Sequence, residues 1–214
     1  MLSVRWTLWN LFLGIVPVIA ALVTAALARR GMQKGGRLAW LFAIPAAAVW
    51  FAFLPNTCYL LTEWRHFLFD PQFAALRRSV ETDRTMLLKV AQWGLFYLLY
   101  SGFGCVCFAL SIRPIERLFH AKRTLLLALT VPFFFLISVG VYMGLIVRLN
   151  SWDIVRRPWV VWEVMVRVVS TPILLNTVSV FAILLWLMYQ MIGIWIEGAQ
   201  SRFGKYRTVF SAKH

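Results

Sequence analysis

The sequence predicts an all-α protein: a polytopic transmembrane helical bundle of five spanning helices, or six, plus one or two interfacial helices. Of its 214 residues, 61% are hydrophobic and 14% are charged, whereas soluble domains carry about 25% charged residues. The mean hydropathy is +0.75. Five apolar segments reach or approach the roughly 20 residues that a helix needs to cross the hydrocarbon core. These observations assign residues 1–214 to a single integral membrane domain.

The five predicted spans follow one another along the chain and end before a basic tail at residues 197–214. The second is shorter than the others, and residues 57–61 would lengthen it if the helix continued beyond a kink at Pro55. The first could be read as a signal peptide, but Arg29 and Arg30 directly after it argue against cleavage. The predicted spans are 6–28, 38–54, 86–112, 124–147 and 173–196.

Two further segments combine aromatic residues with charges, which is typical of helices at the headgroup level. The first covers residues 57–73. The second covers residues 158–170, where Glu163 and Arg167 stand four residues apart on one helix face. Because Pro172 separates this second segment from the last span, we expect an interfacial helix; the alternative joins it to a sixth crossing.

The chain is strongly basic, with a net charge of +14 that is spread over every loop. This distribution favours contact with the lipid bilayer and its anionic headgroups, and the absence of a basic groove motif predicts no nucleic-acid binding. Lys and Arg are slightly more frequent on the side that carries loops 29–37 and 113–123 and the tail. The positive-inside rule makes this side cytoplasmic. We therefore expect the N-terminus outside and the C-terminus in the cytoplasm.

Small residues in the spans provide surfaces for close helix packing. Gly140 and Gly144 stand in GxxxG spacing in the fourth span, and they could pack inside the bundle or support a homodimer. Cys105 and Cys107 point to different faces of the third span and are expected to be packing residues rather than a disulfide. The scattered histidines and cysteines predict no metal site, and no motif identifies a cofactor.

Two polar clusters interrupt the apolar chain and carry the candidate site. The first covers residues 54–66, at the end of the second span, and the second covers residues 148–153, after the fourth. Two crossings separate the clusters, so they lie on the same side of the membrane in either orientation. We therefore expect them to contribute to one shared polar site.

The first cluster contains a break in the helical hydrogen bonding and a candidate acid–base pair. Pro55 has no N–H, so the carbonyl of Phe51 loses its helical partner, and Asn56 could supply a substitute or line a small polar cavity. Glu63 and His66 share a helix face if this segment is helical. They could form an acid–base pair or bind a metal; the alternative is a salt link or a helix-end cap.

The second cluster offers a cation and a carboxylate. Arg148 could bind an anionic headgroup or phosphate, while Asp153 could act as a base or a ligand. The alternative is a structural turn of Asn150, Ser151 and Asp153 that Trp152 anchors at the interface. Arg148 and Asp153 could also pair. The hypothesis for the combined site assigns catalysis to Glu63, His66 and Asp153, and substrate binding to Asn56, Arg148 and Asn150.

Residues of both clusters resemble a known pattern: Phe53-Leu54-Pro55-Asn56, Tyr59, Thr62-Glu63 and His66, then Gly140-Val141-Tyr142 and the run from Arg148 to Asp153. This pattern resembles the domain-of-unknown-function family 1361 of small bacterial integral membrane proteins, over about residues 38–195. The resemblance implies a multi-pass protein of the bacterial inner membrane and no defined activity. The chain departs from the family pattern at Glu63, which replaces an Asp, and at Leu145, which replaces a frequent Arg.

The sequence is compatible with three functions. The first is a membrane-embedded enzyme or lipid-processing factor that acts on a lipid-linked or envelope substrate at the headgroup level. The second is an assembly or scaffold subunit, whose basic and aromatic tail would lie on the inner leaflet. The third is a small-solute transporter component, but charges inside spans usually mark a transport pathway, and the predicted spans contain almost none.

Overall fold

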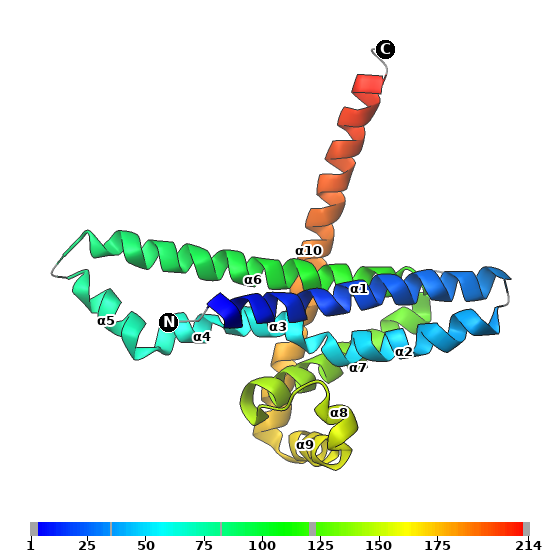
Figure 1. Ribbon diagram of the computed structural model, residues 1–214, viewed down its shortest axis with the longest axis horizontal. Coiled ribbons are helices and arrows are strands. Elements are labelled where there is room, and N and C mark those ends of the chain that lie inside the picture. The colour runs from blue at the N-terminus through cyan, green and yellow to red at the C-terminus, as the bar shows by residue number, and fades with distance from the viewer. Residues whose placement is uncertain (1–3, 35, 82, 120–122, 212–214) are drawn as a thin grey trace.

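The computed structural model describes residues 4–34, 36–81, 83–119 and 123–211 (Figure 1), and in the last helix it describes side chains as far as Arg202. Every regular element in these ranges is a helix, which confirms the all-α prediction. Residues 212–214 of the predicted basic tail lie outside the described residues. The helices are α1 (Val4–Lys34), α2 (Arg37–Phe53), α3 (Pro55–Thr62), α4 (Trp64–Phe69), α5 (Pro71–Ser79), α6 (Met86–Glu116), α7 (Arg123–Tyr142), the π-helix η1 (Met143–Val147), α8 (Asp153–Arg156), α9 (Pro158–Ser170) and α10 (Pro172–Ser211).

Five helical stretches among the described residues are long and apolar enough to cross a membrane. They confirm the five predicted spans, and the protein is an integral, multi-pass membrane protein. α9 has 13 residues, too few to span a bilayer, and Thr171 with its extended backbone separates it from α10. The sixth crossing is therefore not formed. The five stretches are Val4–Gln33, Arg37–Phe69, Met86–Glu116, Ala128–Val147 and Pro172–Arg202.

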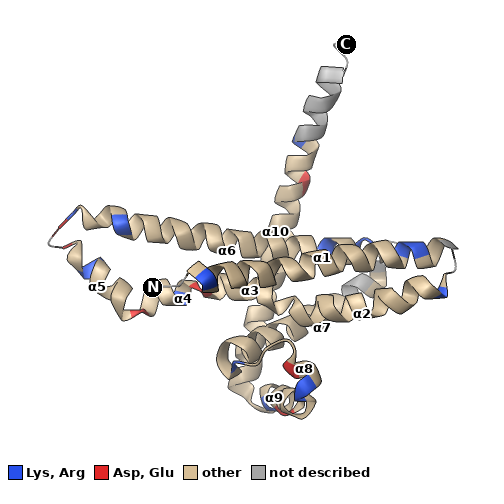
Figure 2. Cartoon of the chain, viewed as in Figure 1, with Lys and Arg blue, Asp and Glu red and all other residues tan. Residues whose placement is uncertain are grey.

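The long helices form a bundle whose charged residues collect toward its ends. α1 packs against α2 and α6, and the three helices run along one another in Figure 1. Lys and Arg gather near the turn between α1 and α2 and near the end of α6, and a second charged group surrounds α5 at the opposite end (Figure 2). Between these ends the long helices are mainly apolar, apart from charges at the start of α1 and near α4 (Figure 2).

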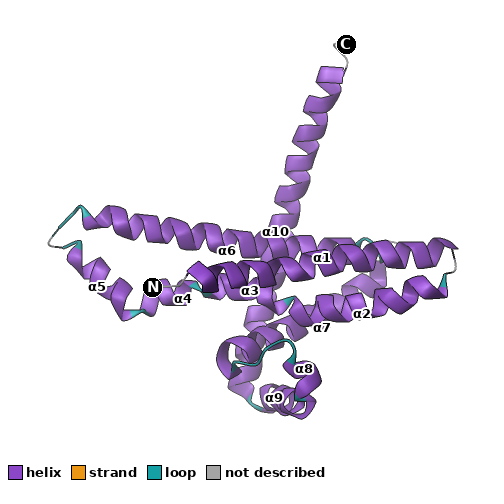
Figure 3. Ribbon diagram, viewed as in Figure 1, coloured by secondary structure: helices purple, strands orange, loops and turns teal. Residues whose placement is uncertain are grey.

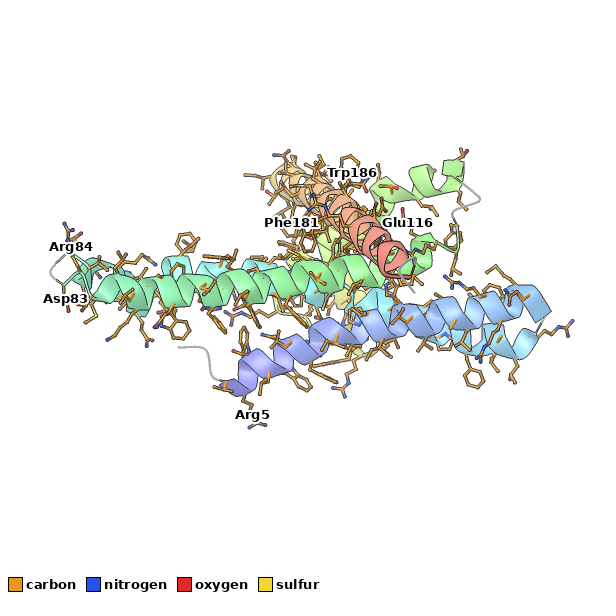
Figure 4. All side chains as sticks on the ribbon, turned by 90° about the horizontal axis from the view of Figure 1, so that it is seen from above. Arg5, Asp83, Arg84, Glu116, Phe181 and Trp186 are labelled. Carbon is orange, nitrogen blue, oxygen red and sulfur yellow. The ribbon has the colours of Figure 1, made fainter. Side chains whose placement is uncertain are left out.

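α10 crosses the other long helices at a steep angle and projects beyond them (Figure 1). It packs on α6, α7 and α9. Ser138 Oγ on α7 donates a hydrogen bond to the carbonyl of Val178 at 2.7 Å. The hydroxyl of Tyr189 donates to the Glu116 carboxylate at the end of α6, which lies near α10 in Figure 4. Interhelical hydrogen bonds of this kind fix α10 against the bundle.

The two predicted interfacial segments differ in their structure. Residues 57–73 contribute to three short helices that are joined by brief turns (Figure 3). Proline fits the first turn of a helix but not its interior, so α3 starts at Pro55 and α5 at Pro71, where Asp70 accepts a hydrogen bond from the Gln72 N–H at 2.8 Å. α9 forms with the predicted bounds. It is seen nearly end-on in Figure 1 and so runs across the direction of α1 and α6.

The short helix α3 fits closely against α6 and α7 because glycines on both neighbours leave room for it. A Cβ atom on Gly104 of α6 would lie 2.7 Å from the carbonyl oxygen of Thr57. A Cβ atom on Gly140 of α7 would lie 2.7 Å from Pro55 Cγ. Side chains at these positions would push the helices apart. Close approach at small residues is a main source of helix association in lipid.

Both glycines of the GxxxG pattern therefore pack against residues of the same chain. Gly140 faces Pro55, and a Cβ atom on Gly144 would overlap the hydroxyl oxygen of Tyr59. These contacts favour the internal-packing interpretation. A homodimer through Gly140 and Gly144 stays a prediction that a single chain does not test, although α3 already covers that surface.

We predict that Gly104→Ala destabilises the fold, whereas Gly102→Ala on the same helix does not. The added methyl group at Gly104 would press on the backbone of α3, and overpacking of this kind costs about 1–3 kcal/mol. A Cβ atom on Gly102 would meet no atom within 4 Å. Thermal unfolding of both purified variants in one detergent measures the difference. Equal unfolding temperatures would contradict the close packing of α3 on α6.

Candidate functional site

The two polar clusters meet around one cavity. Asn56 Nδ2 on α3 donates a hydrogen bond to Ser151 Oγ at 3.2 Å and so joins the first cluster to the second. This polar cavity has a volume of about 690 Å³. Its polar lining residues are Asn10, Asn56, Tyr59, Arg65, His66, Arg148, Asn150 and Ser151.

Three tryptophans also line the polar cavity. Trp6 and Trp9 come from the first turns of α1, and Trp152 belongs to the second cluster. All three side chains are partly exposed. Trp6 packs edge-on against His66, with ring centroids 6.3 Å apart. Indole rings favour the headgroup level of a bilayer, where the ring and its N–H are both accommodated. These residues are therefore suited to the part of a lipid where the headgroup meets the hydrocarbon chain.

The break in the second span places Asn56 on the cavity wall. α2 ends at Phe53 and α3 starts at Pro55, with only Leu54 between them. Thr57 Oγ1 donates to the carbonyl of Leu54 at 2.7 Å, which satisfies a backbone acceptor at the helix end. The broken backbone is thus stabilised inside the protein, where a polar helix end is tolerated in a membrane.

A strained backbone presents Arg148 at the cavity. α7 continues into the π-helix η1, after which Arg148 adopts the left-handed conformation with φ 61° and ψ 36°. It is the one non-glycine residue with positive φ in the described part of the chain. This conformation costs roughly 1–2 kcal/mol for a residue with a Cβ atom. The N–H groups of Arg148 and Leu149 both donate to the carbonyl of Met143. Strained residues and π-bulges concentrate at functional sites.

Tyr59 forms a wall of the polar cavity and depends on a glycine. Its hydroxyl donates to the carbonyl of Gly140 at 3.3 Å. The same hydroxyl occupies the space that a Cβ atom on Gly144 would need. Gly144 therefore determines where this wall stands.

Glu63 and His66 form a carboxylate–imidazole pair at the edge of the cavity. Glu63 Oε2 lies 3.5 Å from His66 Nε2. Glu63 is only 4% exposed, while His66 is partly exposed and lines the cavity. A buried carboxylate behind an accessible imidazole can orient a histidine for proton transfer. The two side chains lie on the same side of the chain, as their three-residue spacing predicted, but Glu63 Oε2 has no hydrogen-bond partner among the described residues. Their role as an acid–base pair stays a prediction.

Asp153 holds the loop of the second cluster and does not line the cavity. One of its oxygens accepts a hydrogen bond from the Asn150 N–H at 2.7 Å, and the other accepts two from Arg157 at 2.9 and 3.1 Å. The hydrogen bond from Asn150, followed by those from Arg157, lowers the pKa of Asp153. The ion pair suggested with Arg148 is wrong, because Arg157 stands one helical turn after Asp153 and takes its place.

Sequence reasoning missed the contribution of α1 to the site. Trp6, Trp9 and Asn10 are far from both clusters in the chain, and the packing of α1 on α3 brings them to the cavity. Asn10 was a usable signal, because a polar side chain inside an apolar span needs a polar partner. Arg65 belongs to the first cluster, but its spacing gave no reason to assign it a role.

The polar cavity is cationic. Arg65 and Arg148 line it, and within the described residues neither has a carboxylate at ion-pair distance. The nearby acids are used elsewhere, since Glu63 faces His66 and Asp153 faces Arg157. Guanidinium groups bind phosphate and carboxylate groups through paired, charge-assisted hydrogen bonds. The arrangement therefore suits an anionic ligand.

Comparison with known proteins agrees with the resemblance seen in the sequence. A family model described as "Protein of unknown function (DUF1361)" matches residues 9–189. The chain belongs to this family. The matched region contains both polar clusters and reaches from α1 into α10. Comparisons with curated proteins and with solved structures found no match. DUF1361 membership supports an integral membrane protein and leaves its activity to be argued from the site.

We predict that acidification weakens the loop of the second cluster through Asp153. A carboxylate whose pKa is lowered by folding stabilises the fold fully at a pH above its ordinary pKa of 3.8. This stabilisation is lost as the pH falls from 3.8 through the lowered pKa. Thermal stability should therefore fall on acidification below pH 3.8 more steeply for the wild type than for Asp153→Asn. Glu163→Gln, which removes an exposed carboxylate on α9, should keep the wild-type profile. Parallel profiles for wild type and Asp153→Asn would rule out the assigned contacts.

Proposed function

We propose that this protein is a multi-pass protein of the bacterial cell membrane that binds the phosphate-bearing headgroup of a lipid or lipid-linked envelope substrate. One observation carries the proposal: Arg65 and Arg148 converge with three tryptophans in a cavity that, among the described residues, no carboxylate lines. Guanidinium groups provide charge-assisted hydrogen bonds to phosphate. Tryptophans hold the apolar part of the same ligand at the headgroup level.

The size and polarity of the polar cavity support a headgroup rather than a bare ion. Its volume of about 690 Å³ lies within the roughly 300–1,000 Å³ of small-molecule sites. Asn56, Asn150 and Ser151 add neutral donors and acceptors, which suit the hydroxyl groups of glycerol or a sugar beside the phosphate. Arg148 and Asn150 are exposed, so a ligand can reach them without rearrangement of the helices.

We assign His66 the role of proton acceptor, oriented by Glu63. Because His66 Nε2 faces Glu63, Nδ1 is the nitrogen left for a bound ligand. Nδ1 would take the proton from a substrate hydroxyl or an attacking water, and Glu63 would stabilise the imidazolium that results. Asp153 is a positioning residue in this scheme, because it fixes the loop that carries Asn150 and Arg148.

In the proposed topology the polar cavity lies on the outer side of the membrane. Trp6 and Trp9 place the cavity at the end of the bundle where α1 begins, and the charge distribution favours an outside N-terminus. The cavity would then receive headgroups from the outer leaflet of the membrane.

We predict that Arg148→Asn weakens headgroup binding without destabilising the fold. Asparagine visits the left-handed backbone more readily than arginine, so thermal stability should stay the same or rise. Loss of one hydrogen bond to a charged group, about 1.5–3 kcal/mol, lowers affinity about ten- to a hundredfold. Isothermal titration of protein in nanodiscs with short-chain phosphatidic acid measures this affinity.

The matched control for this experiment is Arg156→Asn. Arg156 is exposed on α8 and does not line the polar cavity. The Arg156→Asn variant should bind short-chain phosphatidic acid as tightly as the wild type does. Equal losses in the two variants would indicate attraction to surface charge in general. Wild-type affinity in Arg148→Asn would refute the assigned site.

We predict that Glu63→Gln and His66→Gln abolish turnover but leave binding of short-chain phosphatidic acid intact. Both variants keep Arg65 and Arg148, which provide the phosphate contacts, and remove the oriented base. Mass spectrometry of a membrane lipid extract incubated with each protein follows conversion of phosphate-bearing species. The catalytic assignment fails if the variants convert these species as well as the wild type does, or if the wild type converts none.

A further inference from the structure

A second, smaller cavity of about 130 Å³ adjoins the polar cavity. The two cavities share four lining residues, Tyr59, Leu149, Asn150 and Ser151. From this shared wall the second cavity extends between residues of α2, α7 and α9. Away from the wall its lining is entirely apolar, and includes Phe51, Leu136, Met143, Ile154, Val161 and Met165.

Apolar side chains at the rim of this apolar cavity are accessible from the bilayer. Phe51 and Leu136 are 40% and 38% exposed on the spanning helices α2 and α7, where exposed apolar side chains face lipid. Ile154, on the short helix α8, is 47% exposed. Met143 and Met165 add flexible side chains that adapt to an irregular ligand. A hydrocarbon chain can therefore enter the apolar cavity sideways from the membrane.

We propose that the apolar cavity holds the hydrocarbon chain of the ligand whose headgroup occupies the polar cavity. This inference rests on the proposed function and adds the binding site of the hydrocarbon chain, so that the lipid is recognised by headgroup and chain together. The lining changes from polar to apolar at Tyr59, in the same order in which a lipid changes from headgroup to chain. The hydroxyl of Tyr59, bound to the Gly140 carbonyl, marks the boundary.

A series of ligands that differ only in chain length tests this proposal. Glycerol 3-phosphate has no chain, and its mono-acyl esters carry chains of increasing length. Each ligand is titrated into the full-length protein in nanodiscs, with empty nanodiscs subtracted. Referred to the free ligand in water, the wild type should bind glycerol 3-phosphate and gain up to about fourfold in affinity for each methylene group until the apolar cavity is filled.

Two variants fill the apolar cavity from different helices. Val161→Phe does so from α9, and Ala52→Leu from α2. Val166→Phe is the matched control, because Val166 is 49% exposed on α9 and lies outside the cavity. Val161→Phe and Ala52→Leu should bind the longest ester at least tenfold more weakly than the wild type, yet bind glycerol 3-phosphate equally well. Helix content and unfolding temperature identify the variants that are correctly folded.

The outcomes separate this inference from the proposed function. Loss of the chain-dependent gain in a folded Val161→Phe or Ala52→Leu, but not in Val166→Phe, supports the inference. A full gain in both filled variants, or an equal loss in the control, overturns it. Wild-type binding of glycerol 3-phosphate with no gain from added chain overturns the inference alone. Failure of the wild type to bind any of the phosphate ligands overturns the proposed function as well.

Discussion

Close contact between α3 and the glycines on its two neighbours is the interaction on which the other elements depend. The carbonyl of Thr57 lies against Gly104 on one side, and Pro55 lies against Gly140 on the other. Lipid is as apolar as the helix surfaces, so burial of apolar area contributes little here and tight contact contributes most. The same tightness allows the second span to be broken at Pro55, because the helix ends are enclosed by protein instead of lipid.

The position of α3 also determines the geometry of the site. Asn56 follows the proline break and reaches Ser151 at 3.2 Å. Tyr59 lies one turn further on and fills the space that Gly144 leaves open. A displacement of α3 by the width of a methyl group would separate these contacts. Packing and function are therefore coupled, since the glycines that hold α3 also set the distance between the two polar clusters.

Hydropathy and proline chemistry are local properties, and the parts of the fold that depend on them could be predicted from the sequence. The five spans, the helix at 158–170 and the break at Pro55 are of this kind. The common side of the two clusters follows from the number of crossings between them. The role of α1 in the site could not be predicted, because it depends on which helix faces pack together. The backbone strain at Arg148 could likewise not be predicted from the residue type, because it arises where η1 ends.

The charges around the polar cavity argue for an anionic ligand more strongly than any one residue does. Glu63 and Asp153 are buried acids, and each faces a basic partner inside the protein. Arg148 is exposed, has no carboxylate at ion-pair distance among the described residues, and has a strained backbone. The strain has a cost in the free energy of folding, and it fixes the direction of the side chain at the cavity. A phosphate group bound by Arg148 would neutralise the charge and use that direction, so binding would offset the cost of the strain.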